Sequence, residues 1–173
     1  MEIVVNDANV LIDLFNAGLL PYLKELGLDF RTLDVIINEI EDEEQQSAVQ
    51  SIIDDGILSV YSLSGAQVGT VFRKIAEYQR ACNLSVEDVS VMVYAIDNDC
   101  RLLTGDKKLR EKAILENVKV SGILYLTDML SQADVIGNDD MISSLERLLS
   151  SNNRLPKKLI EDRIDALRSH RIH

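Results

Sequence analysis

The residues best placed to do chemistry in this sequence are acidic. Asp7, Glu39 and Asp106 each come shortly after an apolar run, and Asp88 stands at the start of a predicted helix. Carboxylates bind hard divalent cations such as Mg²⁺ and Mn²⁺. A cation held in this way lowers the pKa of water and neutralises charge on a phosphate group, as hydrolysis of a phosphodiester requires. If the four acids meet in space, the sequence predicts metal-dependent phosphodiester hydrolysis.

Other catalytic chemistries find little support in the sequence. His170 and His173 are the only histidines, and they stand at the end of the chain, where structure tends to fray. Cys82 and Cys100 have neither C-x-x-C spacing nor a histidine at ligand spacing. We therefore expect no zinc site, no catalytic Cys-His pair and no serine triad that depends on histidine.

Each acid also has an ordinary structural interpretation. Asp7 and Asp106 could cap the helices that follow them, and Asp88 could form a capping box with the serine three residues earlier. Glu39 opens a stretch with five acids in six residues, which is typical of a solvated helix start. Glu43 lies on the same helical face and is the substitute candidate for Glu39. Four unrelated caps need not fall at one edge of a sheet, so their convergence would favour the catalytic interpretation.

Five short apolar segments are predicted strands, and helical patterns separate them. The segments are residues 3–5, 35–37, 58–61 and 101–104, with the last strand inside 118–126. Strands that alternate with helices form a parallel sheet through right-handed crossovers. We therefore predict a three-layer α/β/α fold with five parallel strands. Its site should lie beyond the carboxyl ends of the strands, where the four acids would converge.

Four segments of the sequence resemble, in order and spacing, the acidic motifs of PIN-domain ribonucleases. These segments are N-D-A-N-V-L-I-D-L, V-I-I-N-E-I, L-S-V-E-D-V-S-V-M-V-Y-A-I and L-L-T-G-D-K-K-L-R, and the resemblance covers residues 1–130. The family includes toxins of bacterial and archaeal toxin-antitoxin pairs. The resemblance implies a parallel sheet flanked by helices, a small antitoxin protein as partner, and metal-dependent cleavage of single-stranded RNA. It assigns the catalytic carboxylates to Asp7, Glu39, Asp88 and Asp106, and the Mg²⁺ or Mn²⁺ ligands to Asp7, Asp88 and Asp106.

The sequence departs from the family pattern at Ala8, where many relatives carry a hydroxyl residue beside the first acid. Asn9 is the candidate to support Asp7 in its place. Thr104, at the end of a predicted strand, is a second supporting residue, because it could steady Asp106 or the attacking water. A threonine in that position is also common for structural reasons alone.

The resemblance divides the chain into a PIN-like nuclease domain, residues 1–135, and a C-terminal helical extension, residues 136–173. Apolar residues recur there at helical spacing, at Leu155, Leu159, Ile160, Ile164 and Leu167. They predict an amphipathic helix that packs on the domain or on a partner, with an ordinary closing helix as the alternative. Residues 154–173 carry six Lys or Arg against three acids, so this end is basic.

The charge balance limits how the protein can bind RNA. Its 18 Lys and Arg stand against 29 Asp and Glu, and the net charge of −11 repels nucleic acid at long range. Contacts to phosphate must be local, and Lys107, Lys108 and Arg110 are the candidates because they follow Asp106. A charge run of this kind is also typical of a solvated helix face. The sequence has neither a membrane-spanning run nor a basic leader segment, so we expect a cytoplasmic protein.

Two further functions fit parts of the sequence. The protein could be a catalytically silent scaffold whose acids are helix caps and whose basic end docks a partner. Asp7-Ala8-Asn9 also resembles the D-x-D signature of aspartate-nucleophile phosphatases, although its second aspartate is missing. A homodimer is a further state that the sequence leaves open.

Overall fold

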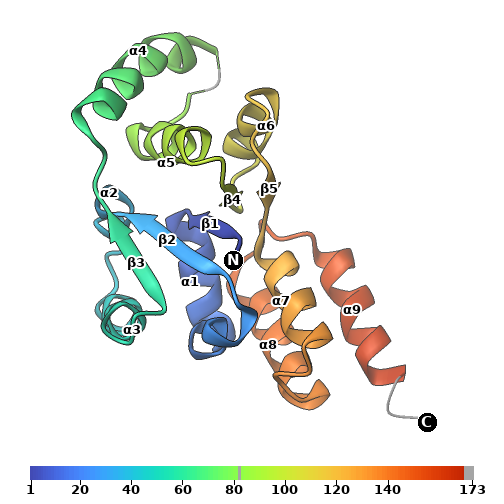
Figure 1. Ribbon diagram of the computed structural model, residues 1–173. Helices are drawn as coiled ribbons and strands as arrows, with labels where there is room; N and C mark the ends of the chain where they lie inside the picture. Colours follow the sequence, from blue (N-terminus) through green and yellow to red (C-terminus); the bar gives the residue numbers. More distant parts are fainter. Residues whose placement is uncertain (82, 170–173) are drawn as a thin grey trace.

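The computed structural model describes residues 1–81 and 83–169 and is shown in Figure 1. Cys82, His170 and His173 lie outside these described residues. In the described part, five strands form one parallel sheet with the order β3-β2-β1-β4-β5. The strands are β1 (Ile3–Asn6), β2 (Asp29–Leu33), β3 (Leu58–Tyr61), β4 (Arg101–Leu103) and β5 (Val120–Ser121). The predicted five-stranded parallel sheet is confirmed.

Helices cover both faces of the sheet (Figure 1). One face carries α4, α5 and α6, and the other carries α1, α3, α7 and α8, with α9 packed against α8. The helices are α1 (Ala8–Ala17), the 3₁₀ helix η1 (Leu20–Leu26), α2 (Asp34–Ile37), α3 (Glu43–Asp54), α4 (Gly65–Ala81), α5 (Val86–Asp97), α6 (Lys107–Leu115), α7 (Ile123–Gln132), α8 (Asn138–Ser151) and α9 (Lys157–Ser169). None of the described helices is long and apolar enough to cross a membrane.

The second predicted strand was placed wrongly. Residues 35–37 belong to the short helix α2, and the strand is Asp29–Leu33, between β1 and β3. The strand escaped prediction because it carries polar residues, whose cost of burial is offset by hydrogen bonds that the folded chain supplies. Its contacts are Arg31 Nε to Asp29 Oδ2 (2.9 Å), Arg31 Nη1 to Tyr94 Oη (3.2 Å) and Thr32 Oγ1 to the Asn6 carbonyl (3.1 Å). Glu39 therefore follows a helical turn rather than a strand.

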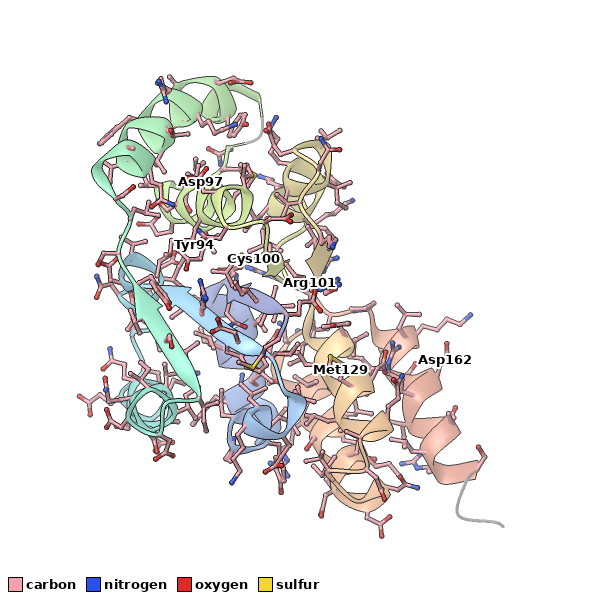
Figure 2. All side chains as sticks on the ribbon, viewed as in Figure 1. Tyr94, Asp97, Cys100, Arg101, Met129 and Asp162 are labelled. Carbon is pink, nitrogen blue, oxygen red and sulfur yellow. The ribbon has the colours of Figure 1, made fainter. Side chains whose placement is uncertain are left out.

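The core forms where the central strands meet α5 and α1. Val4 and Val5 of β1 and Leu102 and Leu103 of β4 have no exposed surface. Residues 89–95 of α5 are all buried, so this part of the helix is packed on every side. Figure 2 shows this packing from the same direction, with Tyr94 and Cys100 labelled near the sheet. The core thus fixes the strand ends that carry the acids.

The C-terminal helices pack on the same body. Helix α8 contacts α1, and α9 contacts α8. Ile160 and Ile164 of α9 are buried, while Leu159 is half exposed. Arg163 of α9 donates to both carboxylate oxygens of Asp128 on α7, at 2.7 and 2.6 Å. The domain boundary after residue 135 stays a prediction.

Candidate active site

Asp7 is the buried acid of the site. It lies at the end of β1, where its backbone N–H donates to the Leu103 carbonyl of β4 at 3.0 Å. Its side chain is only 2% exposed and accepts from Thr104 Oγ1 at 2.8 Å and Asn9 Nδ2 at 3.3 Å. Burial raises the pKa of Asp7, the two hydrogen bonds oppose that rise, and the charge of Asp88 adds to it. Asp7 therefore precedes α1 without acting as a side-chain cap.

Thr104 joins two of the acids at the end of β4. It is fully buried, donates through Oγ1 to Asp7, and accepts at the same oxygen from the Asp106 backbone N–H at 3.0 Å. Asp106 Oδ1 in turn caps α6 by accepting from the Leu109 N–H at 2.8 Å. One hydroxyl thus fixes the position of the Asp7 carboxylate and of the Asp106 backbone.

Asp88 enters the site from the first turn of α5. It forms the predicted capping box, with Asp88 Oδ2 accepting from the Ser85 N–H at 2.9 Å and Ser85 Oγ accepting from the Asp88 N–H at 3.0 Å. Burial raises the pKa of Asp88, the capping hydrogen bonds lower it, and the charges of Asp106 and Glu87 raise it further. The cap fixes Asp88 where two neighbouring acids oppose its ionisation.

Glu39 completes the acidic cluster. Although the side chain as a whole is solvent-exposed, partial desolvation of its carboxyl raises the pKa to about 7, helped by the charges of Asp7, Glu87 and Asp88. Glu43 is an exposed residue in the first turn of α3 and is not among the acids that act on Glu39. The structure therefore brings Glu39, rather than Glu43, to the other acids.

Glu87 also belongs to this group, and sequence reasoning missed it. Its charge raises the pKa of both Glu39 and Asp88. An acid in the first turn of a helix has an ordinary role opposite the helix dipole, which hid it. Its place directly before Asp88 was the signal that could have identified it.

The carboxylate oxygens of the cluster are suitable ligands for a divalent cation, but the side chains are not arranged around a common point. Burial raises the pKa of Asp7, Glu39 and Asp88, and repulsion from neighbouring acids raises it further; a bound cation would relieve that repulsion. Among the described residues, however, no group of three His, Cys, Asp or Glu is arranged to hold a metal ion. Asp88 Oδ2 and Asp106 Oδ1 are occupied by their helix caps, which leaves the second oxygen of each for a ligand. The residues fit a cation if these carboxylates converge on it when it binds.

The three basic candidates of α6 occupy different environments. Lys107 is highly exposed, and its Nζ lies 3.8 Å from Glu111 Oε1. Lys108 is also exposed. Arg110 Nη2 donates to the Thr104 carbonyl at 2.9 Å and so supports the end of β4. Gly122 permits this approach, because a Cβ there would lie 3.0 Å from Arg110 Nη2. Arg110 is thus part of the frame around the acids.

The one cysteine among the described residues does not suggest thiol chemistry. Cys100 lies between α5 and β4 (Figure 2) and is buried and free. Burial raises the pKa of its thiol to about 11, so the reactive thiolate is scarce at neutral pH. Carboxylates remain the chemical groups of this site.

Known proteins similar to this chain have the same kind of fold. Residues 3–169 match the family model of the PIN domain. One similar structure is a chain of the VapBC2 complex from Rickettsia felis, solved with a DNA fragment from the promoter. The two sequences are 13% identical and the structures have a TM-score of 0.52; the match covers 69% of this chain and 98% of the Rickettsia chain. A second is PAE2754 from Pyrobaculum aerophilum, which is 19% identical with a TM-score of 0.50. This match covers 79% of this chain and 98% of PAE2754. At these identities the two structures are alike in fold. No curated protein matches the sequence.

Proposed function

The chain belongs to the PIN-domain family, and from this premise we propose that it is a metal-dependent endoribonuclease that cleaves single-stranded RNA. The observation that supports the proposal is that acids from four separate segments lie close enough for their charges to raise the pKa of a neighbouring acid. The charge of Asp88 helps to raise the pKa of Asp7, the charges of Asp7 and Asp88 help to raise that of Glu39, and the charge of Asp106 helps to raise that of Asp88. Asp88 and Asp106 also cap helices, but capping alone gives them no reason to lie near other acids.

In this proposal Asp7, Asp88 and Asp106 hold Mg²⁺ or Mn²⁺, and Glu39 completes the set. When bound, the cation would lower the pKa of a water molecule and neutralise charge on the phosphate. Thr104 and Asn9 orient the Asp7 carboxylate through their hydrogen bonds. Glu39, with its pKa near 7, can accept a proton at its carboxylate at neutral pH.

The nature of the product ends tests this chemistry. Attack by water leaves 5′-phosphate and 3′-hydroxyl ends, whereas attack by the ribose 2′-hydroxyl leaves a cyclic phosphate. We expect the first outcome, with activity that rises with pH, disappears in chelator and survives His170→Ala and His173→Ala. Cyclic 2′,3′-phosphate products formed in chelator would overturn the roles given to Asp7, Asp88 and Asp106.

The toxin role and the partner are part of the same proposal. VapBC2 of Rickettsia felis, which shares the fold, was solved as a complex with promoter DNA. We accordingly expect a small antitoxin protein that binds this chain, and a cytoplasmic location for both. Isolation of a stable complex with the product of an adjacent small gene supports the role, and a chain that neither binds such a product nor slows growth contradicts it.

A catalytically silent scaffold is the second candidate, and one observation favours it. Asp88 and Asp106 are both engaged in helix caps, and the described acids form no ready metal site. Asp7→Asn separates the two functions, because it should abolish cleavage by a nuclease and leave a scaffold unaffected.

The aspartate-nucleophile phosphatase has less support, since Asp7 is buried and hydrogen-bonded rather than open to attack a phosphate.

A further inference from the structure

A polar pocket adjoins the acidic cluster on the side of the C-terminal helices. Its volume is about 190 Å³. Its lining includes Asn9 and Asp106, which also belong to the acid site, and Asn152 and Arg154 from the connection between α8 and α9. Residues of the acid site and of the C-terminal connection therefore line the same pocket.

Asp13 lines this pocket and lacks a full set of hydrogen bonds. It is 2% exposed, and Asn152 Nδ2 donates to its Oδ1 at 2.9 Å. Its Oδ2 is buried and has no hydrogen-bond partner among the described residues. A buried acceptor without a partner costs free energy, and such exceptions are rare in folded proteins. The pocket therefore offers an acceptor to a ligand that carries an N–H or O–H donor.

Arg154 supplies the positive charge of the pocket. Its backbone N–H donates to Asn152 Oδ1 at 2.9 Å. Asn152 also donates to Asp13, so one side chain holds both Arg154 and Asp13 in place. Its side chain is exposed, and in the described part of the chain its guanidinium has no ion-pair or hydrogen-bond partner. Of the basic residues expected to contact RNA, Arg110 is engaged with Thr104. Arg154 is therefore an available guanidinium in a pocket that includes Asp106, and guanidinium matches phosphate geometry well.

We propose that this pocket is the subsite for the nucleotide next to the scissile phosphate of a single-stranded RNA. Arg154 contacts the phosphate of that nucleotide, and Asp13 Oδ2 accepts from a donor on its sugar or base. The inference rests on the proposed ribonuclease function and gives the C-terminal connection a part in substrate binding. It also explains how a chain with a net charge of −11 holds a polyanion beside an acidic cluster.

RNA binding by three variants tests the subsite. Affinity for a fluorescent single-stranded RNA of mixed sequence is measured by anisotropy with Ca²⁺ present, and cleavage is measured separately with Mn²⁺. Arg154→Gln should weaken binding about tenfold and reduce the slope of log affinity against log salt by about one. Lys158→Gln is the matched control, because Lys158 is an exposed residue four positions along the chain, does not line the pocket, and the change removes the same charge. We expect its effect to be within about twofold.

Asp13→Asn is the second variant, because it keeps the shape and replaces an acceptor by a donor. We expect weaker RNA binding, by at least about threefold, without a fall in melting temperature, since the amide keeps the shape of the side chain and removes a carboxylate whose ionisation burial opposes. If Arg154→Gln and Asp13→Asn both bind RNA as Lys158→Gln does, the pocket is not the subsite. If the variants lose binding but the wild type never cleaves, the subsite holds and the proposed nuclease function fails. If the wild type neither binds nor cleaves RNA, both fail.

Discussion

Replacement of Glu39 by Gln should stabilise the metal-free protein at neutral and alkaline pH. The pKa of Glu39 rises from 4.5 to about 7 on folding, so the folded state binds the proton more tightly than the unfolded state. The stability of the wild type therefore falls as pH rises from 4.5 to 7, and the loss is complete above pH 7. The difference between the two pKa values corresponds to roughly 3 kcal/mol. Because the side chain is exposed, solvent screening reduces this to about 1–2 kcal/mol.

Thermal melting in chelator between pH 5 and pH 8 measures the effect. At pH 8, Glu39→Gln should raise the melting temperature by roughly 2–8 °C, and the gain should shrink toward zero as pH falls to 5. Glu41→Gln is the matched control, because Glu41 is exposed, lies two residues away and is not among the acids that act on Glu39. Addition of Mn²⁺ should reduce the advantage, since a bound cation relieves the repulsion that adds to the effect of burial. A Glu39→Gln variant that is no more stable than Glu41→Gln at pH 8 would refute the electrostatic argument.

Three further outcomes follow from named contacts. Asp7→Asn combined with Asp106→Asn should weaken Mn²⁺ binding at least about tenfold in calorimetry, and unchanged affinity would contradict the metal assignment. Ile160→Ala should cost about 2–5 kcal/mol of unfolding free energy because Ile160 is fully buried, whereas Leu159→Ala, at a half-exposed position, should cost about 0.5 kcal/mol or less. Tyr78 Oη donates to Glu116 at 2.5 Å and helps to lower the pKa of Glu116 to about 2. Tyr78→Phe should therefore cost about 1.5–3 kcal/mol in urea unfolding at pH 7, and less as pH falls from 4.5 toward 2, where Glu116 is protonated.

Much of the local structure could be predicted because its causes are local. The capping box of Ser85 and Asp88 depends on residues three apart, and the cap of α6 by Asp106 depends on the same spacing. The strand that precedes Asp7 is a β-branched run that packs in the core. Such signals need only the sequence within one turn or one strand.

The second strand shows where local signals fail. Residues 35–37 have the composition of a buried strand, and Asp29–Leu33 does not. Arg31 and Thr32 become acceptable in a central strand only because Asp29, Tyr94 and the Asn6 carbonyl satisfy them. Two of these partners are distant in the sequence, so the stability of the strand depends on contacts that no local pattern contains.

The sequence by itself determined the kind of chemistry, the strand ends at Asp7 and Asp106 and the alternation that makes a parallel sheet, because residue type and period are properties of short segments. Only the tertiary structure decided that Glu39 rather than Glu43 joins the cluster, that Glu87 adds to it, and that Asn152 bonds to a residue 139 positions away. These outcomes depend on which segments pack together. Burial and the nearby charges then determine which carboxyl groups have a raised pKa, and both arise only when the chain is folded.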